Sequence, residues 1–361
     1  MPAAGRGRRN WSRSSLVTSV RSAGQCPGYG RASSCNRASG QPVPSDEFKE
    51  VIDRGFSKAA ARQAIDLAET LLREVVNHAS AAFRRCIAEI GPEEDLHIAP
   101  FYLYRHVVEQ IDGVQVLLSE ACATASIPVI RTAFEACLHL EFILQERQKF
   151  ERRSYCWWCD HLRSELSTYE RVDPDTKSGQ EFWAAWVSQI GEAIELPPDL
   201  LRGAKDSIRR RLALPHLQEA NEELDRLSRS NRKPSPRRKV PWFAAYGGPS
   251  NRRELARILK RLAEYDRLYR YWSSVVHGED ADLYLITLAD YRGAFRPVRD
   301  PKDLPRIASL AVALMLRATR SMVTFYRPGE DLAPWYKREI QGPWKQLQAM
   351  RIEIRYRPKA L

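Results

Sequence analysis

Apolar residues recur at intervals of three and four over most of this chain, which is the spacing that gathers side chains on one face of an α-helix. The first long run extends from about Lys58 to Ile90, follows Ser57 as its expected cap, and stops at Gly91. Its apolar positions are Ala61, Ile65, Ala68, Leu72, Val75 and Val76. Such a face must be buried against other elements, so the pattern predicts helices packed on helices.

Further helices are expected over about 98–123, 126–170 with a break near Arg153, 180–195, 198–229, 251–277 and 303–327. Strand signals are confined to Leu283 to Ile286 and Ile352 to Tyr356. We therefore predict an all-α fold, a multi-helix bundle of about seven to nine helices with negligible strand. Apolar residues make up 43% of the 361, which is enough for a sizeable core.

Charge divides the chain into three parts. Residues 1–44 form an Arg/Ser/Gly-rich basic tail that we expect to be disordered, and residues 45–330 form the helical domain, with a basic loop at 228–240 inserted. Residues 331–361 are a basic aromatic segment that packs as a late helix or as an arm. The net charge is +12, but the first 45 residues and the stretch 226–239 carry seven cations each and no acid. Without them the net charge is about −2, so the pI alone does not argue for nucleic-acid binding.

The apolar runs and the cysteines of the sequence indicate the cellular compartment and whether the chain spans a membrane. The tail has no continuous apolar stretch, which excludes a secretory signal. Three interpretations of this tail stay open: a disordered segment, the product of an overextended start codon, or a transit peptide. Its composition resembles that of a transit peptide. The longest apolar run, Ile307 to Leu316, has ten residues where a membrane span needs about twenty. Seven scattered cysteines, an odd number, indicate a reducing compartment, so we predict a cytoplasmic protein without a membrane contact.

Arg131 and Glu135 lie four residues apart in an expected helix and therefore meet on one face, among Phe134, Leu138 and Phe142. Charged side chains in an apolar stripe are rarely buried unless they are paired. Two interpretations stay open. The pair either fixes the helix register as a buried ion pair, or lines a pocket in which Arg131 contacts an anion.

The expected helix 251–277 has two faces. Its apolar stripe comprises Ile258, Leu262, Tyr265, Leu268, Tyr269, Trp272, Val275 and Val276. The opposite stripe is polar and comprises Arg267, Arg270, Ser274 and His277, and Gly278 follows as a helix stop. Arg270 and His277 are nearly two turns apart, so they align with Ser274 between them.

This polar stripe permits a specific chemistry. A histidine can take a proton from a ribose 2′-hydroxyl or give one to a leaving oxygen, and an arginine beside it can clamp a phosphate. These groups suffice for RNA cleavage without a metal. A solvated helix face that ends in a histidine favoured by the helix dipole explains the same residues equally well.

Cys156 and Cys159, followed by His161, have the spacing of a redox or metal motif. A zinc site needs a second ligand pair and a thioredoxin-like site needs a βαβ context, and neither is evident, so both cysteines are expected in the core. No Gly-rich phosphate loop, nucleophile elbow or His-Glu-x-x-His motif occurs. We therefore expect no cofactor and no metal.

Three blocks together resemble a bacterial helical family of unknown function. They are Ile130-Arg131-Thr-x-x-Glu135, Pro241-Trp242-Phe243 and Tyr269-Arg270-x-x-Ser273-Ser274-x-x-His277-Gly278. The resemblance covers roughly residues 95–327, and it brings no established activity with it.

More distantly, the chain resembles the HEPN superfamily of helical, often dimeric domains, many of which are metal-independent ribonucleases of toxin or phage-defence systems. Their hallmark is an Arg, four to six intervening residues and a His late in a helix. Arg270 and His277 fit with six residues between them, although Tyr271 stands where a polar residue usually follows the Arg. The resemblance implies a homodimer that brings two such helices together.

Several functions stay open from the sequence. The first is an RNA-cleaving or nucleotide-binding protein in which His277 is general base or acid, Arg270 stabilises the phosphate, Ser274 hydrogen-bonds nearby, and Arg131 and Glu135 support the site. If it is an enzyme, it is a metal-independent endoribonuclease with RNA or a nucleotide as partner. The second is a non-catalytic binding or scaffold protein with an internal polar network. The third is a regulator that contacts nucleic acid through Arg237, Arg238 and Lys239 of the basic loop.

Overall fold

The computed structural model describes residues 54–90, 95–191, 198–230, 240–272, 285–287 and 293–353. The chain separates into two units, Met1–Lys49 and Glu50–Leu361, and the described residues all belong to the second. The basic tail and the central part of the basic loop, with Arg237, Arg238 and Lys239, lie outside the described residues.

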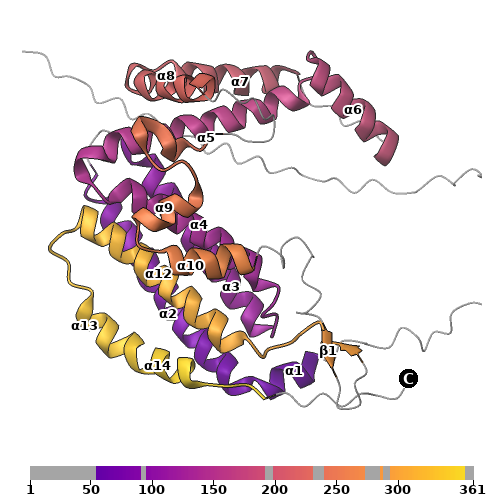
Figure 1. The fold of residues 1–361 in the computed structure, drawn as a ribbon, viewed down its shortest axis with the longest axis vertical. Helices are drawn as coiled ribbons and strands as arrows, with labels where there is room; N and C mark the ends of the chain where they lie inside the picture. The colour runs from indigo at the N-terminus through magenta and orange to yellow at the C-terminus, as the bar shows by residue number, and fades with distance from the viewer. Residues whose placement is uncertain are drawn as a thin grey trace, which may run out of the picture. The chain divides into compact units, whose positions relative to one another are not determined.

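Four long helices form the core of the second unit: α2 (Arg62–Ile87), α3 (Ile98–Ser119), α4 (Ser126–Leu144) and α12 (Leu304–Tyr326). Each of α2, α3 and α4 packs against α12, and α3 also packs against both α2 and α4 (Figure 1). Small residues at helical spacing let the backbones approach closely. Those in α2 and α12 are Ala64, Ala68, Ala79 and Ala82, and Ala308, Ala311 and Ala318, and all are buried. The predicted all-α fold is therefore confirmed.

Helix α12 has the length and hydropathy of a membrane span, as no other helix in the described part of the chain does. Its most apolar window is nevertheless 56% buried against the other helices. Its polar side chains reinforce this packing, since Thr319 forms a buried hydrogen bond, 2.8 Å long, with the hydroxyl of Tyr104 on α3. The apolar character of α12 is that of a core helix.

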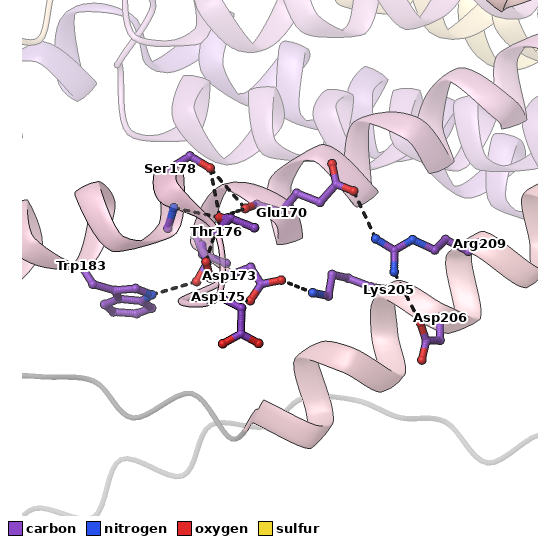
Figure 2. Close-up of polar contacts among 11 residues, drawn as sticks. Glu170, Asp173, Asp175, Thr176, Ser178, Trp183, Lys205, Asp206 and Arg209 are labelled. Atoms are coloured by element: carbon purple, nitrogen blue, oxygen red, sulfur yellow. Dashed lines mark hydrogen bonds and ion pairs between the residues drawn. The ribbon is translucent and has the colours of Figure 1, made fainter.

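A second layer is built on α5 (Phe150–Val172), which packs against α6 (Lys177–Ile190), α7 (Pro198–Leu212) and α8 (Pro215–Ser230) (Figure 1). Figure 2 shows the polar contacts where α5 gives way to α6 and meets α7. Thr176 caps α6 by accepting a hydrogen bond from the Gly179 amide, 3.0 Å away. Lys205 of α7 forms an ion pair with the buried carboxylate of Asp173 in the same turn. A Cβ at Gly179 would lie 1.8 Å from the Asp173 carbonyl oxygen, so the turn requires glycine there.

The C-terminal aromatic segment is helical. It comprises α13 (Ala333–Trp335), the π-helical η7 (Tyr336–Ile340) and α14 (Gln341–Ala349), and α14 packs against α2 and α12. Trp335 donates its indole N–H to Glu74 of α2 at 2.7 Å, and Trp344 donates to Ser309 of α12 at the same distance. Each tryptophan is thus partly buried against the core and its polar atom is satisfied.

Several expected helices are shorter than the periodicity predicts, so the described residues contain more helices than the seven to nine expected. The run after Ser57 is split into α1 (Arg54–Ala60) and α2, and the Ser57 hydroxyl donates to the Arg299 carbonyl oxygen instead of capping a helix. The run 126–170 breaks at the short η3 (Arg147–Lys149), a few residues before the expected break near Arg153, and 198–229 breaks between α7 and α8. Short 3-10 turns occur at η2 (Asp95–His97) and η4 (Trp242–Gly247). Periodicity detects a buried face but not a local reversal of the chain.

The expected continuous helix 251–277 is wrong, because the chain turns inside it. It forms α9 (Arg252–Ile258), a reversal at residues 259–261, α10 (Leu262–Tyr265) and a π-helical turn, η5 (Asp266–Tyr271). The reversal is a Schellman motif: the Arg261 amide donates to the Ala256 carbonyl oxygen and the Lys260 amide to that of Arg257. Lys260 has φ of 58°, a conformation that costs a non-glycine residue about 1 kcal/mol. No glycine marks this turn, so the sequence did not reveal it.

The only strands among the described residues are β1 (Leu285–Thr287) and β2 (Gly293–Phe295), which form a short antiparallel ladder. Part of β1 was expected from the sequence. Residues 352 and 353 of the second expected strand are not in a strand, and the rest of it lies outside the described residues.

A buried arginine fixes the reversal between α9 and α10 against the core. Arg261 is 1% exposed, donates to Glu141 of α4 at 2.7 Å, and donates through Nε to Glu264 of α10 at 3.0 Å. Its guanidinium carbon also lies 4.8 Å from the centre of the Phe134 ring. A charge this deeply buried is tolerated only with such partners, so it sets where α10 and η5 lie on α4.

We expect Arg261→Met to lower the free energy of unfolding by about 3–5 kcal/mol, because it leaves the Glu141 carboxylate buried without its partner. Arg261→Met combined with Glu141→Leu should recover much of this loss. Urea denaturation followed by circular dichroism measures both. The exposed pair of Arg62 and Asp66 supplies the control, since Arg62→Met should cost less than about 1 kcal/mol. Equal costs for the two single variants would refute the assigned role.

Candidate functional site

The first of the three sequence blocks lies on α4 and meets the second there. Arg131 and Glu135 approach to 3.5 Å, and the second Glu135 oxygen lies 3.3 Å from a guanidinium nitrogen of Arg252 on α9. One turn further along α4, the His139 ring packs against Trp242 and Phe243, at centroid distances of 5.5 and 5.7 Å. The Arg131–Glu135 pair is thus a shielded surface network that Arg252 completes, and it lines none of the cavities described below.

The third block begins against the same helix, because η5 packs on α4. The backbone of Arg270 lies in η5, but its side chain, like Ser274 and His277, lies outside the described residues. A π-helical turn holds more residues than an α-helical turn, so the 3.6-residue spacing that aligned Arg270 with His277 does not apply within η5. Leu268 and Trp272 of the expected apolar stripe are buried, whereas Ile258 is 38% exposed.

A cavity of about 570 Å³ opens between η5, α12 and the C-terminal segment, and we call it the basic cavity. Four cations line it: Arg267 of η5, Lys302 and Arg306 at the start of α12, and Arg351 after α14. Asp303 is the only acid among the described residues of its lining. The volume is in the range of small-ligand sites, and the excess of positive charge favours an anion.

Most of these cations have no acidic partner in the part of the chain that the structure describes. Arg267, Lys302 and Arg351 form no ion pair with any described residue, and Arg351 donates only to the carbonyl oxygens of Gln348 and Met350. Arg306 lies 3.8 Å from Asp303, a long contact between two half-exposed side chains. Ser309 adds a hydroxyl, which accepts from Trp344 and keeps its own hydrogen to donate. The cavity therefore offers several donors to an anionic ligand.

The basic cavity adjoins Trp272, which is the last described residue of the third block. The Arg306 guanidinium lies 5.7 Å from the Trp272 ring centre, and Arg306 also lines a small neighbouring cavity together with Trp272, Arg296 and Asp300. The Nε atom of Arg296 is buried without a hydrogen-bond partner in the described part of the chain. The same guanidinium lies 3.4 Å from Asp300 through another nitrogen, so Arg296 is held beside Arg306 by an ion pair.

Sequence reasoning identified only Arg267 among the residues of this cavity, as part of the polar stripe. Lys302, Arg306 and Arg351 were missed because they come from segments that meet only in the folded chain. Arg252 was missed for the same reason, since only packing of α9 on α4 brings it to Glu135. The one available signal was the recurrence of arginine on a face of the apolar helix α12, at Arg306, Arg317 and Arg320.

The cysteine motif lies in the core, as expected. Burial raises the pKa of both Cys156 and Cys159 to about 12, so both are protonated thiols at neutral pH. The Cys159 thiol donates to the Leu217 carbonyl oxygen of α8. These two residues join α5 to its neighbours.

Burial and the positive charge of Arg252 lower the pKa of His139 to about 3 from its usual 6.5. In the unfolded chain His139 is protonated below about pH 6.5, whereas in the folded protein it stays neutral down to about pH 3. His139 therefore destabilises the fold increasingly as the pH falls from 6.5 toward 3. We expect wild type to lose about 2 kcal/mol more stability than His139→Phe between pH 7.5 and 5. Urea denaturation at the two pH values measures this difference, and parallel losses would contradict it.

Comparison of the sequence with models of protein families shows to which family the chain belongs. The model described as "Family of unknown function (DUF5677)" matches residues 97–292, which is more than half of the chain. The match spans α3 to α9, η5 and the segment with all three sequence blocks. No curated protein and no solved structure matches the chain. The chain belongs to the family of unknown function DUF5677.

Proposed function

We propose that this protein binds the phosphate groups of RNA or of a nucleotide in the basic cavity, and that the Arg270–His277 segment cleaves the bound RNA without a metal. The observation that carries the proposal is the set of cavity cations without an acidic partner among the described residues, namely Arg267, Lys302 and Arg351, with Arg306 beside them. Arginine and lysine are the side chains with which proteins hold phosphate, and Arg in particular binds it in a bidentate way.

The covalent chain supports a connection between cavity and motif. Arg267 lines the cavity and belongs to the same π-helical turn as Arg270. Trp272 contacts Arg306, and Ser274 and His277 follow it by two and five residues. An extended chain covers at most about 3.6 Å per residue, so the Cα of His277 lies within about 18 Å of that of Trp272. This reach is compatible with a phosphate held in the cavity.

In the proposed reaction, His277 accepts the proton of a ribose 2′-hydroxyl, and that oxygen attacks the adjacent phosphorus. Arg270 stabilises the charge that develops on the phosphate oxygens, and Ser274 donates a hydrogen bond to them. The 5′-oxygen of the next nucleotide leaves with a proton returned by a histidine. The Arg131–Glu135–Arg252 network supports this site by holding α9 on α4. A homodimer would place two such segments together.

A second candidate is a non-catalytic binding or scaffold protein, and a specific observation favours it. The charged groups on α4 are engaged with protein partners: Glu135 with Arg131 and Arg252, and Glu141 with Arg261. Closed networks of this kind fix the packing of helices without any chemistry. In that case the basic cavity binds an anionic partner and His277 has no role in turnover.

We expect Arg267→Glu with Arg306→Glu to weaken binding of a fluorescent 12-nucleotide RNA at least about tenfold in anisotropy titrations, because two phosphate contacts become repulsive. The exposed Arg105 of α3 pairs with Glu109 and lines none of the described cavities, so Arg105→Glu is the control and should bind as wild type does. Equal weakening by Arg105→Glu would point to bulk charge and contradict a defined site.

The catalytic half of the proposal is tested separately. Purified wild type should fragment total RNA in the presence of EDTA, whereas His277→Ala should leave it intact, since no other group is proposed to take the 2′-hydroxyl proton. The half-exposed His216, which lies 3.4 Å from Asp95, supplies the control variant His216→Ala, and this should cleave normally. Equal RNA integrity with wild type and His277→Ala would exclude the nuclease and leave the binding protein.

A further inference from the structure

A second basic hollow lies further along α12, and we call it the Lys260 groove. Its volume is about 520 Å³, and it lies between the ends of α4 and α9 and the second half of α12. Its charged lining consists of Arg147, Lys260, Arg317 and Arg320, opposed by the single carboxylate of Glu141 among the described residues. The groove is therefore as strongly cationic as the basic cavity.

Most cations of this groove form no ion pair with an acid among the described residues. Lys260 and Arg320 are exposed and form no ion pair with any described residue. Arg147 contacts Phe325, over its ring at 4.5 Å and at its carbonyl oxygen. The one acid of the lining, Glu141, is already engaged by the buried Arg261. Arg317 has an acidic neighbour, Glu264, at 3.7 Å. A polyanion would therefore find partners here without breaking a structural ion pair of the described residues, except at Arg317.

The conformation of Lys260 adds a separate argument. It occupies the left-handed position of the Schellman motif, where glycine is the residue of lowest strain. Local stability alone favours glycine there, yet a long cationic side chain occupies the position at the rim of the groove. Strain held at a ligand-facing residue is typical of functional sites.

The two hollows lie on one face of α12. Pro305, Arg306, Ser309, Leu310 and Ala313 line the basic cavity, and Arg317, Arg320, Ser321 and Thr324 line the groove. Leu310, Ala313, Arg317, Arg320 and Thr324 follow Arg306 at steps of three and four, which is one side of a helix. From Arg306 to Arg320 the helix rises about 21 Å. That length accommodates about six stacked nucleotides at about 3.4 Å each.

We propose that the Lys260 groove is a second backbone-binding site, so that the ligand is a single-stranded nucleic acid lying along α12 from the basic cavity to the groove. Each hollow also has a partly buried aromatic residue in its lining, Trp344 in the cavity and Phe325, whose ring lies under Arg147, in the groove. Cations that track a backbone, with aromatic rings on which bases stack, are how proteins hold single strands. This inference rests on the proposed function and adds its substrate class, a strand of several nucleotides.

The test compares a labelled 12-nucleotide single strand with a dinucleotide, for wild type and for Lys260→Gly combined with Arg320→Ala. The double variant should bind the 12-nucleotide strand about tenfold more weakly. The slope of log K against log salt should fall by about 1.4, because each phosphate that the protein no longer neutralises removes about 0.7. Its affinity for the dinucleotide should not change. Thermal melting should show that Lys260→Gly alone raises Tm, because it relieves the left-handed backbone.

Two controls separate charge from backbone strain. Ala121 also has φ of 58°, so Ala121→Gly changes a left-handed position without changing charge and should leave RNA binding intact. Lys260→Arg keeps the charge and should bind the 12-nucleotide strand as wild type does.

The outcomes that overturn the inference are distinct from those that overturn the proposed function. One contrary result is a double variant that keeps the affinity and salt slope of wild type while Arg267→Glu with Arg306→Glu loses binding. That result would refute only the role of the Lys260 groove. Equal wild-type affinity for the dinucleotide and the 12-nucleotide strand, or for a duplex and a single strand, would do the same. No binding of any RNA or nucleotide by wild type would overturn the proposed function, and this inference with it.

Discussion

The burial of Arg261 is the interaction on which the position of both basic hollows depends. A guanidinium that is 1% exposed must keep its acidic partners, and these lie on α4 and α10, so the segment after α9 has one position on the bundle. The residue immediately before it, Lys260, completes the reversal that turns the chain back along the core. This reversal projects Lys260 into one hollow and carries Arg267 to the other. The reversal therefore contributes a cation to each of the two basic hollows.

The distribution of charge separates groups that hold the fold from groups that are available to a ligand. Arg131, Arg252 and Arg261 have carboxylate partners and join α4 to α9 and α10. The cations of the basic cavity and the Lys260 groove face solvent-filled space, and most pair with no acid among the described residues. Like charges held close together raise the energy of the unliganded protein, and an anion removes that repulsion. This contrast is the main physical support for phosphate binding, and it does not depend on the pI of the chain.

The π-helical turn η5 links the two parts of the proposed activity. Wide turns of this kind are rare and occur frequently at functional sites, because they change which side chains face a cavity. The turn η5 contains the cavity-lining Arg267 and the buried Leu268 next to each other, and it carries the backbone of Arg270. The family match, which includes η5, covers the same region. The proposed nuclease chemistry and the proposed strand-binding track thus meet at one segment of the chain.

Local sequence determined the helical fold class, the approximate position of most helices, the meeting of Arg131 with Glu135 and the core location of the cysteine pair. Each of these follows from residue spacing within one helix, which depends on the geometry of the backbone alone. Only the tertiary structure decided where the chain reverses at Lys260, which arginine is buried, and that Arg267, Arg306 and Arg351 line one cavity. These features arise from contacts between residues far apart in the chain. The reversal in particular has a lysine where glycine is the usual signal, so the packing of Arg261 in the core marks it and the local sequence does not.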